Sequence, residues 1–294
     1  MPSDDILDSS TEAHQDLVYD IGMHKGEDTD YYLKKGFRVI GFEADPDLIE
    51  YCKSRFLEAI ERGRLIIVEG AIVEQQFGKT AGRTVKFYKN LENSVWGTIN
   101  DAWAHKNAKL GTHYRILEVK AVDFTECLRK YGIPYYMKID IEGSDTICLR
   151  SLLGFERKPS YISIESDKVS FERLREELNL LARLGYDRLQ AVQQGSVHCQ
   201  VEPTSSGEGV SVGYSFQPGS SGLFGKDLPR GWKSEGQVLR EYKIIFVLYR
   251  LFGDNSLLNK FIIGRLFMRA MERTLRRPVP GWYDTHARHS SVAS

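Results

Sequence analysis

The sequence predicts an α/β fold in which a mostly parallel sheet carries helices on both faces. Short apolar segments alternate with amphipathic segments up to about residue 192, as is typical of βα units joined into a parallel sheet. The apolar runs at 135–141 and 161–165 are nearly continuous, which suits central strands that are buried on both sides. A chain of 294 residues is long enough for one large domain with an appendage.

Turn and cap residues predict where the elements begin and end. A first helix should end at Lys35, because Gly36 follows it in the position of a helix-terminating glycine. Asp45 and Pro46 predict the start of a helix that continues to Gly63, and Asp123 with Glu126 forms a capping box. The other expected elements are strands at 17–19, 37–42, 65–68, 84–88, 117–122, 135–141, 161–165 and 186–192, and helices ending near 132 and spanning 170–184.

The segment DIGMHKGEDT, at 20–29, predicts a ligand site. It follows the apolar run 17–19 and precedes an amphipathic stretch. A strand that stops at a glycine turn and leads into a helix exposes backbone N–H groups to a ligand. Glu43 ends the next apolar run, and an acidic residue about 20 positions after such a turn can accept hydrogen bonds from two ribose hydroxyls. This layout indicates a cofactor that contains a nucleoside.

The glycine spacing and Asp20 favour S-adenosylmethionine (SAM) as that cofactor. Gly22 and Gly26 form G-x-x-x-G in place of the dinucleotide pattern G-x-G-x-x-G. Asp20 places a carboxylate where a pyrophosphate would be repelled and a cation attracted, and SAM carries a sulfonium and no phosphate. The residues expected to bind the cofactor are Asp20, Gly22, Met23, His24, Lys25, Gly26, Thr29, Glu43, Ala44, Gly70, Ala71, Ser94, Asp140, Ile141 and Glu142.

A second segment, YMKIDIEGSD at 136–145, places Asp140 and Glu142 at the carboxyl end of a strand, where open α/β sheets bind ligands. In order and separation, VYDIGMHKGEDT, GFEADP, MKIDIEGSD and YISIES resemble the FkbM-type family of SAM-dependent methyltransferases. The resemblance covers residues 15–195. It implies a Rossmann-like class I methyltransferase fold, with a seven-stranded sheet and a late antiparallel strand, and O-methylation of a sugar or secondary metabolite. His24 and Lys25 depart from the smaller or neutral residues that this turn often has in the family.

Each motif also has a purely structural explanation. The glycine turn, Asp20 and Glu43 are compatible with an ordinary turn and a solvated strand end, and Asp140 and Glu142 would suit the N-terminus of a helix starting near residue 144. Two other functions stay open. An NAD-linked oxidoreductase would share the sheet and the ribose carboxylate but should carry G-x-G-x-x-G, and a non-catalytic module would retain only cofactor binding.

Methyl transfer to a hydroxyl requires alignment of the reacting atoms and a base that removes the proton. Asp140 is the first candidate for this base because it ends a central strand beside the cofactor. Glu165, which ends the next strand, is the second candidate, and His24 is the third. A carboxylate pair could instead hold Mg²⁺, which would polarise the acceptor hydroxyl. The sequence does not choose between these routes.

Three segments lie outside this pattern. The polar stretch 89–114 predicts a long loop whose Asn93, Ser94 and Trp96 close over the cofactor, or whose tryptophans only anchor it. Residues 204–225 contain six glycines and six serines, which predicts a loop or linker. Residues 238–277 have a helical pattern with nine Lys/Arg against three Asp/Glu, and within them 261–277 predicts a helix with an arginine face. We expect this basic part to pack on the main domain, to cap the acceptor site or to form an oligomer interface.

The expected organisation is a flexible N-terminus (1–14), a SAM-binding domain (15–200), a Gly/Ser-rich loop region (201–237) and a helical cap (238–294). Lys+Arg and Asp+Glu are each 40, so no net charge favours nucleic acid. The four cysteines form no C-x-x-C pair, which predicts neither a zinc site nor disulfides and favours the cytoplasm. No signal peptide or transmembrane run is visible. The expected partners are a small-molecule or glycan hydroxyl acceptor and a second copy of the chain, through the C-terminal helices.

Overall fold

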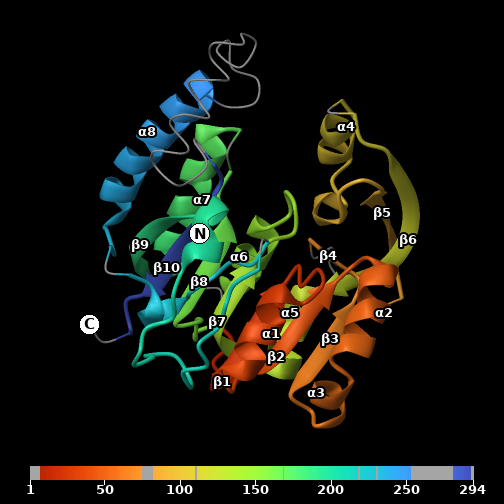
Figure 1. Ribbon diagram of the computed structural model, residues 1–294, viewed down its shortest axis with the longest axis horizontal. Coiled ribbons are helices and arrows are strands. Elements are labelled where there is room, and N and C mark those ends of the chain that lie inside the picture. The colour runs from red at the N-terminus through yellow and green to blue at the C-terminus, as the bar shows by residue number, and fades with distance from the viewer. Residues whose placement is uncertain are drawn as a thin grey trace. The chain divides into compact units, whose positions relative to one another are not determined.

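The computed structural model describes residues 7–74, 82–109, 111–167, 169–217, 219–229, 231–252 and 281–292. The main sheet has seven strands in the order β3-β2-β1-β7-β8-β10-β9 (Figure 1). Its strand pairs β1–β2, β1–β7 and β2–β3 are parallel, and β10 is antiparallel to β9. This mostly parallel sheet confirms the predicted α/β fold. The chain divides into two compact units, 1–162 and 163–294, which are described in turn.

The strands of the first unit bury their apolar runs as expected. They are β1 (Ala13–Ile21), β2 (Arg38–Glu43), β3 (Leu65–Glu69) and β7 (Ile133–Ile139). All seven residues of β7 and the last five of β1 are buried, which is the pattern of strands covered on both faces. Ordered backbone begins before the predicted domain boundary at residue 15, because Asp8 already pairs with Phe155 in a β-bridge.

The predicted caps of the first unit are formed. The Asp45 carboxylate accepts a hydrogen bond from the N–H of Asp47, and Asp123 accepts from Thr125 and Glu126. These satisfy N–H groups that have no partner within a helix. The helices are α1 (Glu27–Lys34), α2 (Pro46–Arg55), α3 (Leu57–Glu61), α5 (Phe124–Tyr131) and α6 (Thr146–Leu152).

The expectation of one helix from Pro46 to Gly63 is wrong. The backbone leaves the helical region at Phe56, with φ −113° and ψ 25°, and this residue separates α2 from α3. The Phe56 ring is buried and lies so close to Gly26 that a Cβ there would come within 2.3 Å of it. Packing of this ring under the glycine turn therefore outweighs the local helical pattern.

A small second sheet, in the order β4-β6-β5, also belongs to the first unit. Its strands are β4 (Ala71–Val73), β5 (Thr84–Asn90) and β6 (Tyr114–Asp123). The stretch 89–114 is not the predicted long loop, because it contains the 3₁₀ turn η1 (Ser94–Trp96) and the helix α4 (Asp101–Lys109). The Asn100 side chain accepts a hydrogen bond from the N–H of Trp103. This Asn cap before Asp101 is the local signal that predicts the helix.

The second unit begins at Ser163, within β8 (Tyr161–Glu165). Its other helices and strands are α7 (Phe171–Arg183), β9 (Tyr186–Gln193), α8 (Glu235–Phe252) and β10 (Tyr283–His289). The 3₁₀ turns η2 (Gln194–Cys199) and η3 (Gly225–Asp227) lie between β9 and α8.

The helical prediction for 238–294 fails at β10, which is a sheet strand. This strand could not be predicted from the sequence, because its buried positions include Asp284, Thr285 and His286. The alternation of apolar and polar residues that is typical of a half-buried strand is therefore missing. The helix α8 confirms the helical pattern from Val238 up to Phe252. The helix predicted at 261–277 lies outside the described residues.

The Gly/Ser-rich segment 201–237 is mostly irregular, as expected, but buried carboxylates organise it. Glu202 accepts hydrogen bonds from the N–H groups of Val212 and Gly213, at 2.9 and 2.7 Å. Asp227 accepts from the N–H of Gly207 and Glu208 from that of Lys226, both at 2.6 Å. Backbone groups that lack a strand or helix partner are thus bonded to side chains.

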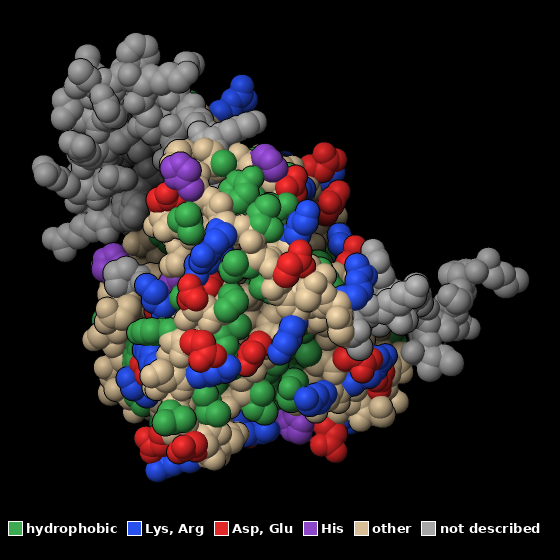
Figure 2. Space-filling view, turned by 90° about the vertical axis from the view of Figure 1, so that its right-hand side faces the viewer, with side chains coloured by type: hydrophobic (Ala, Val, Ile, Leu, Met, Phe, Trp, Pro, Cys, Tyr) green, Lys and Arg blue, Asp and Glu red, His purple; other side chains and the backbone are tan. Residues whose placement is uncertain are grey.

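The surface carries no large area of one charge on the face shown in Figure 2, where acidic and basic side chains are interspersed. This mixture agrees with a formal net charge of zero. No helix within the described ranges is both long enough and apolar enough to cross a membrane.

Candidate cofactor site

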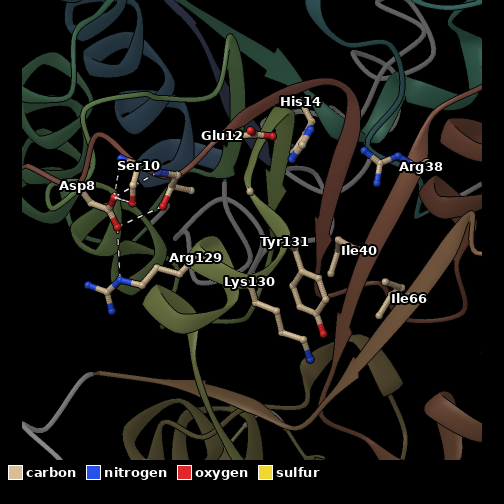
Figure 3. A pocket seen from close by; sticks show the side chains of 12 residues that line it. Asp8, Ser10, Glu12, His14, Arg38, Ile40, Ile66, Arg129, Lys130 and Tyr131 are labelled. Carbon is tan, nitrogen blue, oxygen red and sulfur yellow. Dashed lines mark hydrogen bonds and ion pairs between the residues drawn. The ribbon is translucent and has the colours of Figure 1, made fainter.

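A hollow in the first unit lies at the amino ends of the strands and includes Asp8, His14, Arg38 and Arg129 (Figure 3). Its guanidinium groups already have partners, since Arg38 pairs with the Asp16 carboxylate at 2.7 Å and Arg129 with that of Glu126 at 2.6 Å. Ligands of open α/β sheets bind at the carboxyl ends of the strands. The candidate site is therefore the opposite end of β1, β2 and β7.

The turn after β1 depends on its two glycines. Gly22 has φ +82°, and a Cβ on it would lie 1.9 Å from the carbonyl oxygen of Asp140. Gly26 has φ +77° and lies over the Phe56 ring. The N–H groups of Gly22 and Met23 both donate to the carbonyl of Phe42. Only glycine permits this close approach of the turn to the end of β7.

Glu43, at the end of β2, joins two turns. Its Oε1 accepts hydrogen bonds from the N–H groups of Ala44 and Asp45, at 2.8 and 2.9 Å, and its Oε2 accepts from that of His24 at 2.9 Å. Burial raises the pKa of this carboxyl to about 7, although the three hydrogen bonds act in the opposite direction. A carboxylate has about four acceptor positions, so about one stays open for a ligand hydroxyl.

A buried lysine connects the turn to β7. The Lys138 ammonium is held by the carbonyl oxygen of Gly22 at 2.9 Å and by the Asp20 carboxylate at 3.3 Å. The carboxylates of Asp28 and Asp140 lie 3.7 and 3.9 Å away. Burial opposes the charged form of Lys138, but these carboxylates outweigh it and raise its pKa well above the usual range.

Asp20 therefore forms an ion pair within the chain, with the Lys138 ammonium. It is fully buried, and its Oδ2 accepts a hydrogen bond from the Thr29 hydroxyl at 2.6 Å. Sequence reasoning missed Lys138, although a signal was present: residues 138 and 140 share one face of a strand, because side chains alternate. A lysine two positions before Asp140 was thus placed to reach the same carboxylates.

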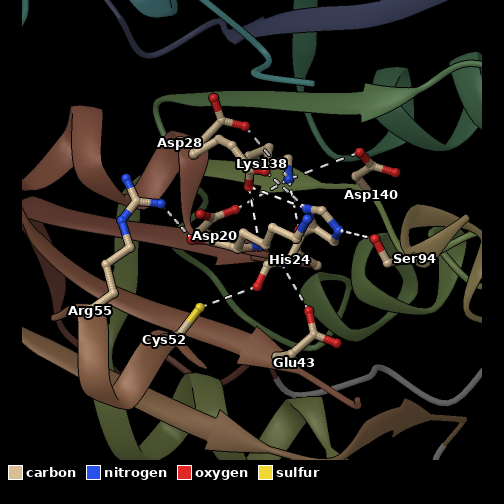
Figure 4. A network of polar contacts seen from close by, with 12 residues as sticks. Asp20, His24, Asp28, Glu43, Cys52, Arg55, Ser94, Lys138 and Asp140 are labelled. Atoms are coloured by element: carbon tan, nitrogen blue, oxygen red, sulfur yellow. Dashed lines mark hydrogen bonds and ion pairs between the residues drawn. The ribbon is translucent and has the colours of Figure 1, made fainter. Parts of the chain in front are cut away.

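His24, within the turn, contacts residues on both sides of it (Figure 4). Its Nδ1 lies 3.1 Å from the Glu27 carboxylate and its Nε2 lies 2.8 Å from the Ser94 hydroxyl. From α2, the Cys52 thiol donates to the carbonyl of His24 and Arg55 donates to that of Lys25. The sequence placed His24 and Ser94 in one site, and the structure brings them together across 70 positions of the chain.

The turn after β7 is braced by Asp145. Its carboxylate accepts hydrogen bonds from the N–H groups of Ile141 and Gly143, at 2.9 and 3.1 Å, and burial raises its pKa to about 6. The Thr98 hydroxyl donates to the carbonyl of Glu142 at 2.8 Å. Asp145 holds the N-cap position of α6. The Asp140 side chain is 44% exposed beside this turn.

The Methyltransferase FkbM domain model matches residues 20–188. The chain belongs to the FkbM methyltransferase family. The match contains the glycine turn, Glu43 and the turn after β7, which are the parts that the structure brings to one edge of the sheet.

No curated protein matches the sequence. Among solved structures, the chain is similar to a SAM-dependent methyltransferase from Archaeoglobus fulgidus, with 12% identity, coverage of 93% of this chain and 86% of that one, and a TM-score of 0.36. A SAM-dependent methyltransferase from Geobacter sulfurreducens in complex with S-adenosyl-L-homocysteine has 12% identity, coverage of 94% and 85%, and a TM-score of 0.33. Likeness at this level does not bear on the cofactor or the acceptor of this chain.

The remaining predicted residues of this FkbM methyltransferase fall in two places. Gly70 donates its N–H to the carbonyl of Glu43 at 2.8 Å, and Ala71 is buried at the start of β4, so both lie beside the end of β2. Glu165 ends β8 and belongs to the second unit.

Metal binding gains no support from the geometry. Within the part of the chain that the structure describes, no group of three or more His, Cys, Asp or Glu side chains could hold a metal ion. The Mg²⁺ route therefore stays an untested alternative.

Proposed function

We propose that this FkbM methyltransferase binds SAM at the turn after β1 and transfers the methyl group to a hydroxyl of a sugar or a secondary metabolite. One observation carries the proposal. β1 and β2 are parallel neighbours with Ile21 in register with Phe42, so the glycine turn and Glu43 end at the same edge of the sheet. This is the edge at which open α/β sheets bind nucleotide-type cofactors.

Charge favours SAM over a dinucleotide. The carboxylates of Asp20, Asp28 and Asp140 surround the single ammonium of Lys138, so this cluster of four groups is negative overall. A negative environment attracts a sulfonium and repels a pyrophosphate. This supports the methyltransferase over the NAD-linked oxidoreductase.

The residues of the site would bind and align rather than react covalently. The open acceptor position of Glu43 suits a ribose hydroxyl, and Gly22 lets the turn lie directly against the end of β7. SAM, when bound, supplies an electrophilic methyl group on sulfur. Alignment of that group with the acceptor oxygen and exclusion of water are the tasks left to the protein.

The affinity of Glu43 variants for SAM tests the proposal. Hydrogen bonds to a charged group are worth about 1.5–3 kcal/mol each, so Glu43→Ala should weaken SAM binding at least about tenfold. Isothermal titration calorimetry with SAM, without added metal, gives the dissociation constants. A thermal unfolding curve of the variant checks that the turns, which Glu43 joins, still fold.

Glu69→Ala is the matched control. Glu69 ends β3 in register with Glu43, but its side chain is 37% exposed and pairs with Lys53 and Lys120, so its loss should leave SAM affinity unchanged. Unchanged affinity in Glu43→Ala, or tight binding of NAD by the natural chain, would contradict the proposal.

Turnover separates the enzyme from a non-catalytic module. Candidate hydroxyl acceptors are incubated with methyl-labelled SAM, and mass spectrometry locates the transferred methyl group. We also propose that residues 15–200 bind SAM and that 238–294 serve the acceptor or an oligomer interface, in a cytoplasmic setting.

A further inference from the structure

His24 is held by two different chemical groups, one at each ring nitrogen. Nδ1 lies 3.1 Å from the Glu27 carboxylate, and Nε2 lies 2.8 Å from the Ser94 hydroxyl. The side chains of His24 and Glu27 are only about one-fifth exposed, at 20% and 19%. A histidine that is oriented by a carboxylate and bonded to a hydroxyl has the arrangement of a general base.

The contacts determine which nitrogen is basic. Burial opposes ionisation of Glu27, but its hydrogen bond to His24 and the charge of His24 outweigh burial and lower the pKa of Glu27. An ionised carboxylate only accepts hydrogen bonds, so Nδ1 carries the proton. Nε2 is then the acceptor and takes the hydrogen bond from the Ser94 hydroxyl.

From this geometry we infer that His24 is the general base of the methyl transfer, that Glu27 is its positioning residue, and that the acceptor hydroxyl takes the place of the Ser94 hydroxyl at Nε2. The inference rests on the proposed function and extends it to the acceptor. Ser94 is a primary alcohol, so the space beside Nε2 already accommodates an aliphatic hydroxyl. An aliphatic alcohol, as on a sugar, is the acceptor class that fits.

The nearby carboxylates of Asp140 and Glu43 are less suited as the base. Asp140 lies 3.9 Å from the Lys138 ammonium, so a cation of the chain already interacts with its carboxylate. Three backbone N–H groups already occupy most acceptor positions of Glu43. Charged groups that interact with His24 are Glu27 on α1 and Glu43 at the end of β2, and the charge of Lys138 on β7 acts on Glu27.

The reaction balances without a further reactant. The acceptor oxygen forms a bond to the methyl carbon while the carbon–sulfur bond breaks, and the bonding pair stays on sulfur as a neutral thioether. The hydroxyl proton moves to Nε2 of His24. The resulting imidazolium keeps its Nδ1–H bonded to Glu27 and later releases the proton to solvent.

The test uses the full chain, SAM and the hydroxyl acceptor found in the screen. His24→Asn should lower kcat by about 10²–10⁴-fold while the SAM dissociation constant changes less than about threefold, within what loss of a weak contact allows. Glu27→Gln keeps an acceptor for Nδ1–H but removes the charge that stabilises the imidazolium. Its kcat should fall, and the acid limb of its kcat/KM profile should move to lower pH.

A second histidine–glutamate pair provides the matched control. His113 Nδ1 lies 2.8 Å from the Glu92 carboxylate, but the two side chains are 80% and 46% exposed. His113→Asn and Glu92→Gln should leave kcat, the SAM dissociation constant and the pH profile unchanged.

Three results would overturn the inference. They are normal kcat in His24→Asn, loss of SAM affinity without loss of kcat in that variant, or loss of turnover in Asp140→Asn with His24→Asn still active. A natural chain that binds no SAM would instead refute the proposed function, so the two failures are distinguishable.

Discussion

At the scale of single residues, buried charges define the site. Lys138 is 5% exposed and Asp20 is fully buried, and an ion pair at such depth persists only when each partner is well bonded. Here the ammonium also binds the Gly22 carbonyl and the carboxylate also binds the Thr29 hydroxyl. The charges thus hold the glycine turn in place.

A buried histidine in the second unit predicts a pH effect on stability. His286 is 1% exposed, and burial lowers its pKa from 6.5 to about 3. Between pH 6.5 and pH 3 the unfolded chain binds a proton at His286 that the folded chain does not. The contribution of His286 to the free energy of unfolding is therefore highest above pH 6.5 and decreases as the pH falls. At pH 5 the loss is about 2 kcal/mol. Urea unfolding of the natural chain and of His286→Gln, at pH 7 and pH 5, measures it.

Comparing His286→Gln with the natural chain isolates the contribution of His286 to the free energy of unfolding. The comparison is needed because Glu43 changes this free energy with pH in the opposite direction. Its pKa is raised to about 7, so its contribution to stability decreases as the pH rises from about 4.5 to 7. His113→Gln, at an 80% exposed side chain, is the control and should behave as the natural chain. Equal losses on acidification in His286→Gln and the natural chain would contradict the prediction.

At the scale of elements, the strand–turn–helix unit from β1 to α1 depends on which glycine is replaced. Gly22 and Gly36 both have positive φ, at +82° and +98°. A Cβ on Gly22 would lie 1.9 Å from the Asp140 carbonyl, whereas nothing lies within 4 Å of one on Gly36. The two positions therefore share backbone strain and differ in space.

Gly36→Ala should cost about 1–2 kcal/mol of unfolding free energy, the cost of the left-handed conformation alone. Gly22→Ala should cost roughly 3 kcal/mol or more, because steric overlap adds to this strain, and it should also abolish SAM binding. Denaturant unfolding and calorimetry measure both effects. Similar costs at the two positions would show that the close contact with β7 is not rigid.

At the scale of the whole molecule, the C-terminal segment is part of a folded unit. β10 pairs with β9 along its length. The Tyr242 hydroxyl on α8 lies 2.6 Å from the Ser166 hydroxyl and 2.8 Å from that of Thr285, and all three side chains are at most 5% exposed. The cap predicted at 238–294 therefore supplies core residues to the second unit.

Deletion of 238–294 should consequently disrupt the second unit. The truncated chain would leave β9 without its antiparallel neighbour and remove the buried Tyr242, so we expect rapid proteolysis after residue 162 and loss of a cooperative unfolding transition. Tyr242→Phe, which removes only the hydroxyl, is the milder comparison and should cost about 1–3 kcal/mol. A truncated chain with cooperative unfolding and full methyl transfer would contradict this prediction.

Sequence alone determined the features that depend on neighbours in the chain. Asp45 and Asp123 cap helices as predicted, because a cap needs only N–H groups two or three positions away. The glycine turn and Glu43 follow apolar strands, so their common edge of the sheet was also predictable from the parallel pattern.

Tertiary structure alone decided which distant side chains meet. The pairing of Lys138 with Asp20, and the contact of His24 with Ser94, join residues 118 and 70 positions apart. The break at Phe56 and the polar strand β10 likewise follow from packing that no local periodicity records. Hydrogen bonds and burial depend on distance in space, whereas propensities and caps depend on distance along the chain. For this reason the sequence indicated the sheet edge expected to bind the cofactor, and only the fold favoured His24, with Glu27, as the base.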